Sequence, residues 1–194
     1  MAFDLKDYSA SAETYEKLVK NGQASAEDWH KLGVSYHGLG KLAEASQALN
    51  KACEMNNTLK GAQGLLAHIS MSQNKYPDAV RLYKAELSLS PQDPSLREAL
   101  RESCWQAGLL LVSQKKWMEA IPYFEDGLTV PSKRSSGFQY ELAKVFSQIK
   151  NKKKGLNYLA QAVKKDSSLK IQARRDPNLA YLRKYPEFRK IVKR

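Results

Sequence analysis

Cysteine, histidine and long apolar runs are all scarce in this sequence. The chain has two cysteines and three histidines among its 194 residues, with no spacing typical of a disulfide framework or a zinc site. No apolar run reaches the roughly 18 residues that a membrane-spanning helix needs. A glycine-rich phosphate loop and a Gly-x-Ser-x-Gly elbow are absent as well. We therefore expect a protein that is not an enzyme, with no metal, no cofactor and no small-molecule substrate.

The amino-terminal stretch has no secretory signature. It reads MAFDLKDYSASAETYEKL, without the basic segment and apolar core that mark a signal peptide. We therefore expect a cytoplasmic protein as the sequence is written. A periplasmic location stays open if a signal that preceded Met1 has been removed.

Acidic residues are scarce in the last third of the chain. Residues 1–131 hold 14 Lys and Arg against 16 Asp and Glu, whereas residues 132–194 hold 18 against 4. The net charge of +12 therefore arises entirely from the second segment. Such a segment attracts an acidic protein, a membrane surface or a nucleic acid, with strong salt dependence; the alternative is a solvated helical face. The candidate anion-binding residues are Lys150, Lys152, Lys153, Lys154, Arg174, Arg175, Arg183 and Lys184. The first four of these are expected in a loop between two helices.

Small and apolar residues recur with a period of about 34 residues. Each copy reads as two helices, with a small residue on each that permits close packing and apolar residues at i, i+3, i+4 and i+7 around it. The first copy contains Trp29, Leu32, Gly33, Tyr36, Ala45 and Leu49. The corresponding small pairs of the later copies are Ala67 with Ala79, Gly108 with Ala120, and Ala143 with Gly155.

This pattern resembles the tetratricopeptide repeat (TPR) family over residues 26–165; the alternative is an unrelated helical bundle. The resemblance implies an all-α solenoid of helical hairpins, a right-handed superhelix whose first helices line a concave groove that holds peptides or partner proteins. The carboxyl-terminal pattern Asp-Pro-x-Leu-x-x-Leu-x-x-x-Pro-x-Phe resembles the segment that closes bacterial proteins of this kind. In that reading Leu179, Leu182, Phe188 and Ile191 pack on the last repeat.

The predicted organisation has six parts. They are a leading helix or half repeat at residues 1–22, repeat 1 at 26–59, repeat 2 at 60–93, repeat 3 at 94–134 with an extended first helix, repeat 4 at 135–167, and basic capping helices at 168–194.

One face of each first helix is not used for packing. By helical periodicity this face holds the residue after Trp29 and those four and seven positions later. The same rule, applied to each first helix, predicts a ligand-binding set in the groove: His30, Val34, His37, His68, Met71, Trp105, Leu109, Val112, Tyr140 and Lys144. The middle of this set is apolar, which is typical of a site for an amphipathic helix or an extended segment. Gly61 and Gly64 are expected to leave room for a ligand backbone.

All three histidines fall on this face. His30 and His37 are about 10 Å apart along the helix axis, too far to share a metal ion. The histidines either line the groove as plain polar residues or hydrogen-bond a partner with some pH sensitivity. The prediction for the whole chain is a noncatalytic adaptor that binds a peptide or protein segment, with anion binding by the basic end as the alternative function.

Overall fold

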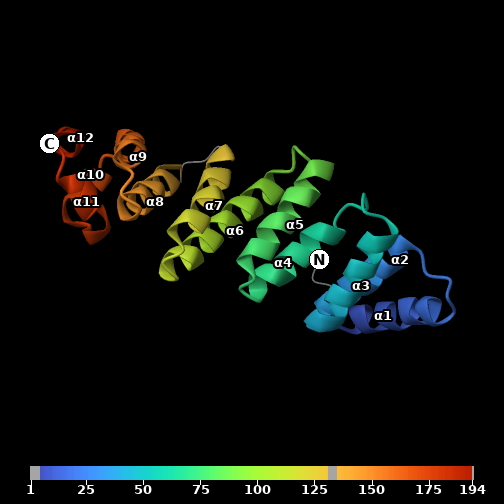
Figure 1. Cartoon of the computed structure of the whole chain (residues 1–194). Helices are drawn as coiled ribbons and strands as arrows, with labels where there is room; N and C mark the ends of the chain where they lie inside the picture. Colours follow the sequence, from blue (N-terminus) through green and yellow to red (C-terminus); the bar gives the residue numbers. More distant parts are fainter. Residues whose placement is uncertain (1–4, 131–134, 194) are drawn as a thin grey trace. The chain divides into compact units, whose positions relative to one another are not determined.

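The computed structural model describes residues 5–130 and 135–193, and within them the chain is all-α (Figure 1). Its helices pack as consecutive hairpins, which confirms the predicted fold class. The last four residues of the predicted third repeat, 131–134, lie outside the described part, as do residues 1–4 and 194. No helix of the described part is long and apolar enough to cross a membrane.

The helices follow one another in two compact units, unit 1 up to Arg97 and unit 2 from Glu98 onward. The helices of unit 1 are α1 (Leu5–Lys20), α2 (Ala26–Gly38), α3 (Leu42–Met55), α4 (Ala62–Ser72) and α5 (Tyr76–Leu89). The boundary falls within α6 (Pro94–Ser113). Unit 2 continues with α7 (Trp117–Thr129), α8 (Ser135–Gln148), α9 (Lys152–Lys165), α10 (Leu169–Arg175), the 3-10 helix η1 (Pro177–Leu179), α11 (Ala180–Arg183) and α12 (Pro186–Ile191).

In unit 1 the small residues of the repeat bring α2 and α3 together. A Cβ added to Gly33 would lie 2.6 Å from Cγ of Leu49, so only glycine permits this approach. Ala45 and Leu49 are fully buried at the same contact. A capping box at Ser25 begins α2: its hydroxyl accepts from the Asp28 amide, and the Asp28 carboxylate accepts from the Ser25 amide. Local sequence signals therefore define this hairpin.

In unit 2 two glycines lie under aromatic rings. A Cβ on Gly108 would lie 2.4 Å from Cε1 of Phe124, and one on Gly127 would lie 2.2 Å from Cε1 of Phe138. The two phenylalanine rings and Trp105 meet edge to face, with 5.0 Å between the ring centroids of Trp105 and Phe138. These contacts pack α6, α7 and α8 into one apolar layer.

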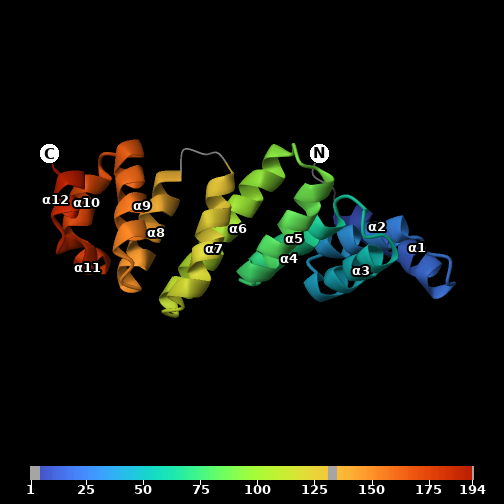
Figure 2. The same ribbon diagram turned by 45° about the horizontal axis from the view of Figure 1, so that its top comes forward.

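The carboxyl-terminal segment covers the last hairpin, as Figures 1 and 2 show for α10 to α12 beside α9. Leu179 and Leu182 are fully buried and Phe188 is nearly so, in a cluster with residues of α8 and α9. Pro177 begins η1 and Pro186 begins α12, as is usual for proline at the first helical position. The predicted packing of this segment on the last hairpin is confirmed.

Candidate functional site

Two of the predicted groove histidines lie together in unit 1. The rings of His37 on α2 and His68 on α4 are 5.5 Å apart between centroids, with their planes at 75°. Burial lowers the pKa of His37, and the positive charge of a protonated His68 lowers it further. Both lower the affinity of His37 for a proton, so its neutral form is favoured as a hydrogen-bonding group.

The third histidine, His30, lies against a glycine with left-handed backbone geometry. Gly61 has a φ of +90°, and a Cβ added to it would lie 3.4 Å from Cε1 of His30. Burial lowers the pKa of His30, while the negative charge of Glu86 acts in the opposite direction. His30 is therefore held beside the start of α4 in a partly apolar position.

A buried carboxylate occupies the place where the sequence suggested room for a ligand. Glu86 on α5 is 2% exposed, and its two oxygens accept hydrogen bonds from the amides of Gly61 at 2.7 Å and Gly64 at 3.0 Å. A Cβ on Gly64 would lie 3.3 Å from Cγ of Glu86. The expectation of a free backbone-binding space at these glycines is wrong, because Glu86 satisfies the first amides of α4.

The five predicted residues of unit 1 form a surface that we call the α2–α4 face. Its members are His30, Val34, His37, His68 and Met71. On α2 they follow at i, i+4 and i+7, on α4 at i and i+3, and the His37–His68 contact joins the two rows. Val34 is 37% exposed, His68 is exposed and Met71 is half-buried. The described residues of the chain include no group of three or more His, Cys, Asp or Glu able to hold a metal ion.

The predicted apolar groove residues of unit 2 are only partly accessible to a ligand. Trp105, Leu109 and Val112 on α6 are half-buried. The Trp105 ring packs against Phe124 and Phe138, so much of its surface is used inside the unit. Leu109 and Val112 are the other half-buried apolar side chains of this helix face.

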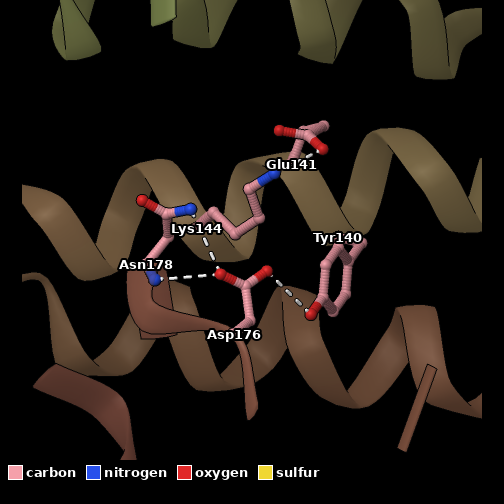
Figure 3. Close-up of polar contacts among 5 residues, drawn as sticks. All are labelled: Tyr140, Glu141, Lys144, Asp176 and Asn178. Carbon is pink, nitrogen blue, oxygen red and sulfur yellow. Dashed lines mark hydrogen bonds and ion pairs between the residues drawn. The ribbon is translucent and has the colours of Figure 1, made fainter. Parts of the chain in front are cut away.

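Tyr140 was predicted to be an open groove contact, and this is wrong. The side chain is 3% exposed, and its hydroxyl donates to the Asp176 carboxylate at 3.1 Å (Figure 3). Burial raises the pKa of Tyr140, and the charge of Asp176 raises it further. The segment between α10 and η1 covers this position, and Asn178 holds Asp176 there through its backbone and side-chain nitrogens.

Lys144 is likewise occupied within the unit. Its ammonium lies 2.7 Å from the carboxylate of Glu141, one turn earlier on α8 (Figure 3). The two side chains are only 19% and 11% exposed. A ligand at Lys144 would therefore have to compete with an existing, largely buried ion pair.

The lysine cluster begins a helix instead of forming a loop. Lys152, Lys153 and Lys154 are the first turn of α9, and the Asn151 side chain accepts from the Lys154 amide as the N-cap. Lys152 pairs with Glu187 at 2.8 Å, and its ammonium lies 4.4 Å from the Tyr185 ring centroid. The four lysines of the cluster are therefore in two different environments. Lys150, Lys153 and Lys154 are exposed, while Lys152 binds α12.

The four remaining basic candidates also divide into two kinds. Arg175 and Lys184 are exposed. Arg174 donates from Nε to the carbonyl oxygen of Val192 at 3.0 Å, and Arg183 donates from Nη2 to the carbonyl oxygen of Asp176 at 2.7 Å. The two arginines of the second kind are therefore held in place by backbone oxygens.

Sequence reasoning missed Glu86 and Asp176, the two carboxylates that organise these regions. Each acts on residues more than 20 positions away, so helical periodicity carries no signal for it. Gly61 and Gly64 are the sequence signal that could have located the Glu86 contact, because glycines mark a place where another group approaches the backbone closely.

Comparison with known proteins supports the repeat assignment. Two family models described as tetratricopeptide repeat match residues 26–59 and 64–97. No curated protein sequence matches the chain significantly.

Solved structures share the fold at low identity. A TPR repeats protein from Bacteroides fragilis is 14% identical, with a TM-score of 0.60 over 92% of this chain and 90% of that chain. MamA from AMB-1 is 17% identical, with a TM-score of 0.54 over 84% of each chain. YrrB, described as a TPR protein with an unusual peptide-binding site, is 15% identical, with a TM-score of 0.51 over 94% of this chain and 88% of that chain.

Proposed function

The chain is a tetratricopeptide repeat protein, and we propose that it is a noncatalytic adaptor that binds a peptide or protein segment through the α2–α4 face. TPR proteins generally mediate protein–protein interactions. The α2–α4 face belongs to the part of the chain that the family models match.

The observation that carries the proposal is the joined row of partly exposed side chains across α2 and α4. The His37–His68 contact joins imidazole nitrogens of α2 and α4 on the same face as the exposed Val34. A surface with apolar anchors and a few polar groups suits a peptide, since apolar contacts supply affinity and polar groups fix register. On unit 2, the half-buried Leu109 and Val112 of α6 are proposed as a separate pair of apolar contacts.

Peptide selection against the full chain tests this function. Peptides enriched from a random library are measured by fluorescence anisotropy against Val34→Asp and His68→Ala. The matched control is Met55→Asp on α3, which places the same charge on a residue that is 49% exposed outside this face. We expect Val34→Asp to weaken binding by about tenfold or more, because it puts a charge at an apolar contact. Equal binding by Val34→Asp and Met55→Asp would contradict the proposal, as would failure to enrich any peptide.

A second candidate function is binding of an anionic surface by the basic carboxyl-terminal third. It is favoured by the exposed Lys150, Lys153 and Lys154, for which no carboxylate partner is found among the described residues. Such binding falls steeply as salt rises.

Retention on heparin across a salt series tests the second candidate. The double variant Lys150→Glu/Lys153→Glu is compared with Lys60→Glu/Lys75→Glu, which changes the same charge at exposed lysines of unit 1. Elution at clearly lower salt for the first pair alone is the expected result. Identical elution of the two pairs would show a net-charge effect without a defined surface.

A further inference from the structure

We propose that a pocket in the carboxyl-terminal segment binds an acidic peptide segment that carries one apolar side chain. The pocket has a volume of about 530 Å³ and is lined by Arg174, Arg183, Phe188, Arg189, Val192 and Lys193. This inference deepens the second candidate function, because it assigns a defined site and ligand class to part of the basic end. Arg189, Lys193 and the apolar base are not among the residues that the sequence predicts for anion binding.

The first support is an uncompensated charge. Four of the six lining residues are basic, and none of the four has a carboxylate within ion-pair distance in the part of the chain that the structure describes. The acids of the same segment are engaged elsewhere, Glu187 with Lys152 and Asp176 with Tyr140 and Asn178. The pocket therefore presents positive charge that no carboxylate of the described residues balances.

The second support is that two guanidinium groups are already positioned. Arg174 and Arg183 each donate to a backbone carbonyl oxygen, which fixes the side chain but leaves its charge unbalanced. Nε of Arg183 is buried and has no hydrogen-bond acceptor among the described residues. A guanidinium held this way loses little conformational entropy on binding, and its planar donors suit the two oxygens of a carboxylate.

The third support is the apolar base, which selects the ligand class. Phe188 and Val192 line the bottom of the pocket but are only 2% and 5% exposed, so most of the accessible apolar surface comes from the methylene stems of the surrounding basic residues. A bare inorganic anion would leave this surface uncovered. A side chain such as Leu or Phe would cover it, and adjacent carboxylates would reach the four cations. The volume is within the range of about 300–1,000 Å³ usual for ligand pockets.

A nucleic acid or a membrane fits the pocket less well. Phe188 is only 2% exposed, so its ring offers no face on which a base can stack. A membrane surface would be contacted by protruding lysines such as Lys190 and Lys184, which do not line the pocket. An acidic protein segment is the ligand that uses both the cations and the apolar base.

The test measures binding of the peptide fluorescein-Asp-Asp-Glu-Phe-Ser-Glu-Asp-Asp-amide, labelled at its amino terminus, to the full chain by anisotropy. The pocket variant is Arg189→Glu/Lys193→Glu, two exposed residues of the rim. The control is Arg175→Glu/Lys190→Glu, which changes the same charge at exposed neighbours outside the pocket. We expect the pocket pair to weaken binding by about tenfold or more and the control pair by less than about threefold. Circular dichroism confirms that both variants are folded.

Two comparisons separate the inference from the broader second candidate. A peptide with Ser in place of Phe keeps the charge and should bind about tenfold more weakly, because it cannot cover the apolar base. Equal binding of the two peptides, or equal loss in the pocket and control variants, would overturn the pocket while leaving general anion binding intact. Binding to phosphatidylglycerol vesicles that depends on the pocket pair, without peptide binding, would also overturn it. Absence of both peptide binding and heparin retention would contradict the second candidate as well.

Discussion

At the scale of single residues, close packing under aromatic rings makes specific demands on side-chain size. Gly127 on α7 has the Phe138 ring where a Cβ would be, whereas a Cβ on Gly137 of α8 would meet the Trp105 ring at an ordinary 3.4 Å. Both glycines lie within helices, where alanine is intrinsically preferred by about 0.5–1 kcal/mol. The two positions therefore form a matched pair in which packing and helix propensity can be separated.

We expect Gly127→Ala to lower the free energy of unfolding by about 1–3 kcal/mol, because the added methyl overpacks the Phe138 contact. Gly137→Ala should change it by less than about 1 kcal/mol, since its methyl enters an ordinary contact. Denaturant titration of both variants checks this. If Gly127→Ala is as stable as the wild type, Phe138 can move aside and the aromatic layer is less constrained than its contacts indicate.

The two partly buried histidines of α2, His30 and His37, predict that the protein becomes less stable as the pH falls. Burial lowers the pKa of His30 and His37 in the native state relative to the ordinary value of 6.5. The unfolded chain therefore binds more protons as the pH falls through about 6.5, and stability is lost in that direction. The groups facing them are Glu86 and Lys31 beside His30, and His68 beside His37.

The measurement compares thermal midpoints at about pH 7.5 and about pH 5.5, on either side of the ordinary histidine pKa. The thermal midpoint of the wild type should fall further between these two pH values than that of His30→Asn/His37→Asn, which removes both titrating groups. His68→Asn alone should reduce the loss slightly, because only its charge on His37 is removed. A wild-type loss no larger than that of the double variant would show that the histidines do not carry the pH dependence.

At the scale of the helices, Glu86 shows how one side chain defines the start of another element. Its carboxylate accepts from the two amides at the beginning of α4, and Gly61 in left-handed geometry precedes that helix. Removing an acceptor from a buried donor costs about 1–3 kcal/mol. We therefore expect Glu86→Gln to destabilise the protein by that amount, since the amide has one acceptor for two donors.

Glu54→Gln is the control for this change, because Glu54 lies on the surface in an exposed pair with Lys51. Exposed pairs contribute about 0–1 kcal/mol. Hydrogen exchange of the α4 amides should accelerate in Glu86→Gln and stay unchanged in Glu54→Gln. Unchanged exchange in both would mean that α4 begins independently of Glu86.

The helices and their pairing could be predicted because their determinants are local and periodic. Gly33 with Ala45, and the apolar residues around them, recur in phase along the chain. The charge of the lysine cluster indicates a loop, whereas Asn151, the N-cap of α9, indicates a helix that begins at Lys152. Tyr140 could not be placed correctly, because the segment that buries it lies 36 residues later and periodicity assigns only a helix face. Glu86 was missed for the same reason, since its contacts join side chain to backbone across two helices.

At the scale of the whole chain, the carboxyl-terminal segment decides which surfaces of the last hairpin face water. Leu182 is fully buried, and its Cδ1 lies 2.9 Å from the position of a Cβ on Gly155. Ile171 lies on α10 of the same segment and is 63% exposed. Shortening each of the two residues therefore compares the loss of a buried contact of this segment with the loss of an exposed side chain of the same segment.

Leu182→Ala should lower the free energy of unfolding by about 2–5 kcal/mol, because it leaves a cavity between α11 and α9. Ile171→Ala should change it by less than about 0.5 kcal/mol. Denaturant titration supplies the values, and limited proteolysis after Arg175 reports detachment of the segment. Similar stabilities for the two variants would show that the segment adds little to the hairpin that it covers.

The contact between Glu86 and the start of α4 also bears on how this chain can be engineered. Gly61, Gly64 and Glu86 all lie within the predicted second repeat, residues 60–93, so a segment with these bounds contains both halves of the connection. A graft of the complete repeat into another array would transfer the carboxylate and its two amides together. A graft joined between α4 and α5 would separate them. One chimera would contain the buried carboxylate without its donors, and the reciprocal chimera would contain the two amides without their acceptor. The junctions that preserve this module lie outside residues 60–93.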